Sequence, residues 1–124
     1  MGIRAIDHVQ IAVNAAELEA SRRFYSELLG LREVRLDGGP TVRLALGFGR
    51  LDLLPSENWG TPPRAAHVAF EVDDLPSLRQ RLLAEKLPID ESRPLPGYWR
   101  LYVADPSGNQ IELLQPNHDS GAGA

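Results

Sequence analysis

Two histidines and two carboxylates occupy matching places in two similar stretches of this chain. His8 lies in Ile-Asp-His-Val-Gln-Ile-Ala-Val, and His67 lies in Ala-Ala-His-Val-Ala-Phe-Glu-Val. Farther along, Asp52 in Arg-Leu-Asp-Leu-Leu matches Glu112 in Gln-Ile-Glu-Leu-Leu. Two imidazoles and two carboxylates suit a divalent transition metal, namely Zn, Ni, Co, Mn or Fe(II). The sequence therefore predicts a metal site built across a pseudo-twofold axis.

Each candidate ligand taken alone has a structural explanation. A single histidine on an apolar strand is more often a hydrogen-bonded structural residue, and Asp52 alone would face solvent. The placement of all four at equivalent points of a repeat is what favours a metal site. Asp52 is the weakest candidate, because an aspartate is one methylene shorter than Glu112 and reaches less far.

The composition limits the class of protein. The chain has 124 residues, a net charge of −4 and no cysteine. The acidic balance argues against nucleic-acid binding, and the lack of cysteine excludes disulfides, thiolate ligands and a cysteine nucleophile. The first residues contain no apolar signal core, and no stretch approaches the roughly 18–20 apolar residues of a membrane span. A cytoplasmic enzyme or binding protein is predicted, with no membrane partner.

The repeat also predicts the order of the elements. A period of about half the chain is too long for a solenoid unit and indicates a duplicated module. Each half reads as a strand, a helix and three strands, with Asn14 capping a first helix over 16–29. The predicted strands are 6–13, 31–37, 41–47 and 50–55 in the first half, and 65–72, 88–92, 99–104 and 110–115 in the second. The second helix carries Leu75, Leu78 and Leu82.

These elements predict one domain, 1–117, made of two modules at about 5–55 and 65–116. The stretch 56–64, with Gly60, Pro62 and Pro63, is predicted to be the linker between the modules. The tail 118–124 is predicted to be disordered.

Several segments together carry a family resemblance from Ile6 to Pro116. They are Asp-His-Val at 7–9, Arg-Phe-Tyr-Ser-Glu-Leu-Leu-Gly-Leu at 23–31, His-Val-Ala-Phe at 67–70, Val-Asp-Asp-Leu at 72–75 and Tyr-Val-Ala-Asp-Pro-Ser-Gly-Asn-Gln-Ile-Glu-Leu at 102–113. In this order they resemble the vicinal oxygen chelate superfamily, also called the glyoxalase/bleomycin resistance/dioxygenase group. The resemblance implies an α+β, glyoxalase-like fold. Two tandem βαβββ modules would form an open, cupped mixed sheet around a metal, with helices on the outer face, and chains of this size usually form homodimers.

The resemblance places the family's ligand positions on His8, Asp52, His67 and Glu112. Glyoxalase I and methylmalonyl-CoA epimerase use four protein ligands. Fosfomycin-resistance transferases and extradiol dioxygenases use a His-His-Glu set, which here would be His8, His67 and Glu112. Many members have Glu or Gln where this chain has Asp52, so the fourth ligand distinguishes the two subgroups.

Other positions depart from individual subgroups. Glyoxalase I members carry an arginine four residues after the first ligand, where this chain has Ala12, and this argues against a glutathione-dependent glyoxalase. The stretch 94–100 does not match the potassium-binding loop of fosfomycin-resistance proteins. Beyond the two candidate ligands the only histidine is His118 in the tail, which argues against a standard extradiol dioxygenase.

Further residues are predicted to line a substrate pocket. Arg100 and Tyr102 share a strand face; the arginine suits bidentate contacts to a carboxylate or phosphate, and the tyrosine could donate to a substrate oxygen. Gln10 could bind substrate or orient a ligand, and Trp99 could line the pocket mouth. A structural role remains an alternative for each of them.

The chemistry ranked first is a lyase or isomerase reaction on a small substrate whose vicinal oxygens chelate the metal. The metal would act as a Lewis acid, and Glu112 could leave it to act as general base. One alternative is a His-His-Glu metal dioxygenase or transferase. Another is a metal-free small-molecule binding protein of the bleomycin-resistance type. The sequence leaves open whether the site lies within one chain or across a dimer.

Overall fold

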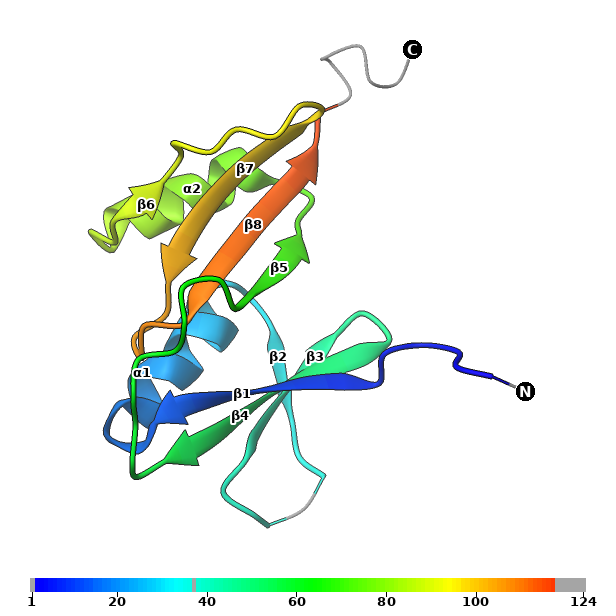
Figure 1. Ribbon diagram of the computed structural model, residues 1–124, viewed down its shortest axis with the longest axis vertical. Helices are drawn as coiled ribbons and strands as arrows, with labels where there is room; N and C mark the ends of the chain where they lie inside the picture. The colour runs from blue at the N-terminus through cyan, green and yellow to red at the C-terminus, as the bar shows by residue number, and fades with distance from the viewer. Residues whose placement is uncertain (1, 37, 118–124) are drawn as a thin grey trace. The chain divides into compact units, whose positions relative to one another are not determined.

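The computed structural model describes residues 2–36 and 38–117, so the predicted tail with His118 lies outside the described residues. The chain divides into two compact units, Met1–Gly60 and Thr61–Ala124, and each contains one four-stranded mixed sheet with a helical segment (Figure 1). This confirms the predicted α+β fold of two βαβββ modules.

The first unit builds its sheet in the order β1-β4-β3-β2, with β1 parallel to β4. Its strands are β1 (His8–Asn14), β2 (Arg32–Val34), β3 (Val42–Leu46) and β4 (Gly49–Ser56). Between β1 and β2 the chain forms a 3₁₀ turn (Ala15–Glu17), α1 (Leu18–Arg23) and a π-helical segment (Phe24–Leu28). The single predicted helix over 16–29 is thus one continuous helical segment with three hydrogen-bonding patterns.

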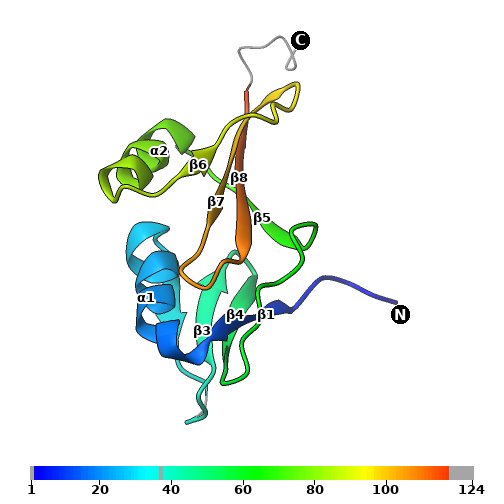
Figure 2. The same ribbon diagram turned by 60° about the vertical axis from the view of Figure 1, so that its left-hand side comes forward.

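The second unit repeats this topology in the order β5-β8-β7-β6, with β5 parallel to β8. Its elements are β5 (His67–Glu71), α2 (Leu75–Ala84), β6 (Ile89–Asp90), β7 (Tyr98–Ala104) and β8 (Gln110–Pro116). Figure 2 shows α2 beside the strands of its own sheet. The duplication that the sequence predicts is therefore present in the strand order.

Local signals begin and end the first helical segment as predicted. The Asn14 side chain accepts a hydrogen bond from the backbone N–H of Ala16 at 3.0 Å, which satisfies one of the free donors of a helix start. Gly30 follows the last turn with φ +84°, a left-handed conformation that glycine adopts without steric cost. Phe24 and Tyr25 are buried between these ends, with their rings edge to face at 5.0 Å.

The second unit uses the same devices with different residues. The Asp74 carboxylate accepts from the backbone N–H of Ser77 at 3.1 Å and caps α2. Leu75, Leu78 and Leu82 are buried at helical spacing. The turn before β8 is closed by Asp105, whose side chain accepts backbone N–H groups at 2.9 Å. Caps and turns of the same kind thus begin and end the elements of both units.

Strand register decides which side chains of a unit lie opposite one another on one face of its sheet. In the first unit His8 lies opposite Arg50, and in the second unit His67 lies opposite Gln110. One step farther along the same face, Asp52 and Glu112 occupy equivalent places on β4 and β8. Within each unit, the histidine and the carboxylate thus share a sheet face, as the alternation of side chains predicts.

Among the described residues, no helix has the length and apolar composition needed to cross a bilayer.

Candidate functional site

A histidine and a glutamate meet directly in the second unit. His67 Nε2 lies 3.0 Å from Glu112 Oε1, and His67 Nδ1 lies 3.3 Å from the carbonyl oxygen of Ala65. The Ala65 carbonyl can only accept, so Nδ1 carries the proton in that bond and Nε2 faces the carboxylate. Either a second ring proton or a divalent cation can then link Nε2 to the carboxylate. This nitrogen and oxygen pair suits the predicted metals.

Tyr102 and Arg100 surround the same carboxylate. Tyr102 lies opposite Glu112 on the neighbouring strand. Burial raises the pKa of the Tyr102 phenol, and its hydrogen bond to Glu112 raises it further, so this hydroxyl remains a proton donor at neutral pH. Arg100 Nη1 lies 3.6 Å from Glu112 Oε2. The structure therefore brings three of the predicted site residues together with His67.

Arg93 completes this cluster and was not predicted from the sequence. Its guanidinium carbon lies 3.7 Å from the centroid of the Tyr102 ring, at cation–π distance. Arg93 Nη2 also donates to Asp90 Oδ2 at 3.2 Å. The Arg93 carbonyl also accepts from Arg100 Nε at 2.9 Å. Arg93 lies between strands in a segment without periodic pattern, so the sequence contains no local signal for this contact.

Asp52 has a different environment in the first unit. It is 1% exposed, and its Oδ1 accepts from Arg50 Nε at 3.0 Å. Its Oδ2 accepts from Arg50 Nη2 at 3.1 Å and from Arg43 Nη1 at 3.2 Å. Both oxygens therefore face guanidinium groups, and a metal ion would have to displace two cations. Asp52 fits a buried ion pair and does not fit a metal ligand in this arrangement.

Only one of the two arginine contacts of Asp52 could be predicted from the sequence. Arg50 lies two residues before Asp52 on the same strand, so alternation alone places both on one face. Arg43 lies opposite Asp52 on β3. That contact depends on the register between two strands, which the sequence pattern did not determine.

His8 is held by its neighbour in the first unit. Its Nδ1 lies 2.8 Å from Asp7 Oδ2, and this hydrogen bond is the main cause of the lowered pKa of the Asp7 carboxyl. Within the described residues, His8 Nε2 has no hydrogen-bond partner. Metal-binding histidines commonly donate one ring N–H to a carboxylate and bind the ion through the other nitrogen. The His8 imidazole fits the role of a ligand.

The remaining predicted residues lie on different faces. Gln10 lies opposite Asp52, on the same face as His8. Trp99 lies in β7 opposite Gln115 and is 40% exposed. Because side chains alternate along a strand, Trp99 points to the face opposite that of its neighbour Arg100, away from Glu112.

No group of three or more histidine, aspartate or glutamate side chains is placed to hold an ion within the described parts of the chain. The prediction that His8 and Asp52 share an ion with His67 and Glu112 depends on the placement of one unit relative to the other. It therefore stays a prediction.

Comparison with known proteins identifies similar chains. The model of the Glyoxalase/Bleomycin resistance protein/Dioxygenase superfamily matches residues 5–113. A solved structure from Bacillus anthracis, described as a glyoxalase family protein, is similar with 28% identity and a TM-score of 0.84, over 94% of this chain and 98% of that chain. No protein of curated function matches the sequence.

Two further solved structures share the fold. A lactoylglutathione lyase from Agrobacterium tumefaciens has 24% identity and a TM-score of 0.73, over 93% of this chain and 96% of that chain. An antibiotic-binding protein from Streptomyces has 23% identity and a TM-score of 0.75, over 94% of this chain and 99% of that chain. An enzyme and a binding protein thus have this same architecture, so the fold alone does not select between the two activities.

Proposed function

Because the chain belongs to the glyoxalase/bleomycin resistance protein/dioxygenase superfamily, we propose that it is a metal-dependent lyase or isomerase. Its substrate is a small molecule with two adjacent oxygens. The observation that carries the proposal is the pair of His67 Nε2 and Glu112 Oε1, 3.0 Å apart on one sheet face. The sequence repeat adds His8 as a third ligand, and the proposal leaves Asp52 out of the set.

The residues around Glu112 have distinct roles in this proposal. His67, Glu112 and His8 would hold a divalent metal, which would supply Lewis-acid polarisation of the substrate oxygens. Tyr102, which hydrogen-bonds Glu112 in the free protein, would donate that proton to a substrate oxygen when substrate is bound, and Arg100 places positive charge beside the same carboxylate. Glu112, buried beside both groups, is the base that accepts a proton from a substrate carbon. Gln10, next to His8 on its face, contacts the substrate from the first unit.

Metal binding by purified, chelator-treated protein tests the proposal. Zn, Ni, Mn and Fe(II) are added separately, and the bound metal is measured by calorimetry and elemental analysis. We expect His67→Ala and Glu112→Gln to weaken binding at least tenfold, because each removes one of few ligands. Glu71→Gln is the matched control, since Glu71 shares the face of His67 but lies at the exposed end of β5.

Three results decide between the readings. Uptake that depends on His67 and Glu112 but not on Glu71 supports the metal site. If Asp52→Asn also abolishes metal uptake, Asp52 is a metal ligand as well. No uptake of any metal would refute the enzyme proposal and leave the second candidate.

That second candidate is a small-molecule binding protein without a metal. It is favoured by the ion pair of Asp52 with Arg43 and Arg50, which occupies one of the four predicted ligand positions. A binding protein would bind its ligand equally well with and without added metal. The enzyme would show turnover only after metal is restored.

The chain is also proposed to form a homodimer, as the resemblance implies. Sedimentation equilibrium tests this directly, and a monomer at micromolar concentration would contradict it.

A further inference from the structure

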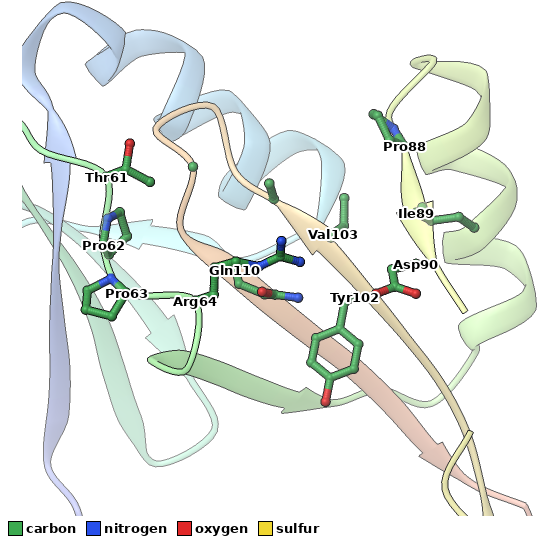
Figure 3. Close-up of a pocket in the computed structure, with 12 residues that line it drawn as sticks. Thr61, Pro62, Pro63, Arg64, Pro88, Ile89, Asp90, Tyr102, Val103 and Gln110 are labelled. Atoms are coloured by element: carbon green, nitrogen blue, oxygen red, sulfur yellow. The ribbon is translucent and has the colours of Figure 1, made fainter. Parts of the chain in front are cut away.

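A pocket of about 360 Å³ lies in the second unit, and its lining includes Tyr102, the residue opposite Glu112. It is lined by the linker segment 61–64, by 88–90, by 102–104 and by Gln110 (Figure 3). A volume of roughly 300–1,000 Å³ is typical of small-molecule sites. The pocket is therefore large enough for a small organic molecule, and of its lining the sequence predicted only Tyr102.

Most of its wall is apolar. Pro62 and Pro63 of the linker lie on one side, and Pro88 lies just before β6. The ring of Tyr102 borders the pocket with Arg93 stacked on it at 3.7 Å. These rings favour an apolar body, since its burial removes hydrocarbon surface from water.

Two polar side chains extend into the pocket. Figure 3 shows the guanidinium of Arg64 and the carboxamide of Gln110 reaching toward the side on which Tyr102 and Asp90 lie. Neither side chain has a hydrogen bond or ion pair with any residue that the structure describes. An arginine offers a planar set of N–H donors that matches a carboxylate or phosphate, so these two groups are available to a ligand.

Asp90 is the one acidic residue of the lining, and its charge is already balanced. Its Oδ1 accepts from the Ser92 hydroxyl at 2.6 Å and from the Ser92 backbone N–H at 2.9 Å. Its Oδ2 lies 3.2 Å from Arg93 Nη2. Arg64 therefore remains the positive charge of the lining without a matching negative charge, and the complementary ligand is an anion.

We propose that this pocket binds a small organic monoanion with an apolar body. Arg64 and Gln110 hold the charged end, and the prolines with the ring of Tyr102 hold the body. Gln110 lies opposite His67 and two residues before Glu112 on the same face of β8. A bound molecule therefore lies beside the candidate site, so the pocket selects the class of substrate; this last step rests on the proposed function, whereas the binding does not.

Two probes of the same shape, one anionic and one neutral, test whether the pocket prefers an anion. Phenylacetate and its neutral analogue phenylacetamide are titrated into the chelator-treated full chain at neutral pH, and binding is measured by calorimetry. We expect phenylacetate to bind about tenfold more tightly, as a charge-assisted hydrogen bond of about 1.4 kcal/mol predicts. Phenyl phosphate, titrated in parallel, shows which anionic end the site prefers.

Variants identify the residues responsible. Arg64→Gln is expected to remove the tenfold preference and leave phenylacetamide binding unchanged. Arg32→Gln is the matched control, because it removes an exposed guanidinium from β2, outside the lining, and should keep the preference. Ala104→Leu places a larger side chain in the lining and should weaken both probes alike. Added salt should weaken phenylacetate binding selectively, because Arg64 is exposed.

Equal affinity for the two probes would overturn the proposal. So would an Arg64→Gln variant with unchanged preference, or the absence of binding by both probes. The metal titrations separate this result from the proposed function, since they depend on His67 and Glu112. If metal binds and the probes do not, only the pocket proposal fails. If the probes bind and metal does not, only the enzyme proposal fails.

Discussion

The contacts of Asp52 predict that it stabilises the fold and does not bind metal. Asparagine has nearly the same shape as aspartate, so Asp52→Asn removes the charge with little change in packing. The variant should unfold more easily and should retain the metal affinity of the wild-type protein. Stability and metal binding are thus expected to separate at this residue.

The magnitude follows from three hydrogen bonds. Asp52 accepts them from Arg50 and Arg43 at 3.0, 3.1 and 3.2 Å. An asparagine can keep two of them, but its NH₂ group then faces the Arg50 Nε–H, and two donors meet. A hydrogen bond to a charged group contributes about 1.5–3 kcal/mol, and removing one partner of a buried ion pair costs about 3–5 kcal/mol.

The lower end of that range applies, because the two arginine side chains are 19% and 22% exposed and water can reach them. We therefore expect the free energy of unfolding to fall by about 3 kcal/mol, and the melting temperature by roughly 10 °C for a chain of this size. Typical domains have about 5–15 kcal/mol of stability, so the variant should remain folded.

Urea unfolding followed by circular dichroism measures the change. Glu91→Gln is the matched control, because Arg79 binds Glu91 with the same bidentate geometry, at 2.9 and 3.0 Å. That pair is exposed, with side-chain exposures of 38% and 45%, so its loss should change stability far less. A loss below about 1 kcal/mol for Asp52→Asn would refute the role of burial in this argument. Weakened metal binding at unchanged stability would show Asp52 to be a ligand.

Three further predictions follow from other contacts. Gly49→Ala should destabilise the protein by about 1–3 kcal/mol, measured by urea unfolding, because a Cβ there would lie 2.7 Å from the backbone oxygen of Asp7. Asn14→Ala should cost about 1 kcal/mol through loss of the helix cap, and Asn14→Ser should recover most of it. The Arg79 side-chain hydrogen bond lowers the pKa of Glu91, so carbon-detected NMR should find this carboxyl titrating below its ordinary value. Since the folded pKa is the lower one, the stabilisation is present above the unfolded pKa and is lost as pH falls through the folded value; an unshifted titration would contradict this reasoning.

The architecture was predictable because its signals are local or repeated. Strand alternation, the Asn14 cap and the glycine after the first helix each act over a few residues, and the structure confirms them. The repeat added the long-range information that each half has the same strand order. The π-helical end of the first helical segment was not predicted, because apolar spacing does not distinguish one helical hydrogen-bonding pattern from another.

The candidate site was predictable only in part. The alternation rule placed His67, Glu112, Arg100 and Tyr102 on strands, and the register then brought them together. The partners of Asp52 and Tyr102 were missed, because Arg43 comes from a neighbouring strand and Arg93 from an irregular segment. A sequence pattern shows which residues share a strand face. It does not show which positively charged side chain will form an ion pair with a given carboxylate.

The two units have a carboxylate at the same position of the repeat, but the two carboxylates have different partners. Asp52 and Glu112 occupy the same place in two identical strand orders. On the strand facing the carboxylate, the first unit has Arg43 and the second has Tyr102. Arg43 and Arg50 neutralise Asp52 in an ion pair with close hydrogen bonds. Glu112 accepts a hydrogen bond from Tyr102, and the guanidinium of Arg100 lies near it at the longer distance of 3.6 Å, so its negative charge remains able to attract a cation. Two of the three hydrogen bonds to Asp52 come from Arg50, and Gln110 occupies the equivalent position before Glu112. These different partners predict a stabilising ion pair at the first carboxylate and a cation-binding site at the second.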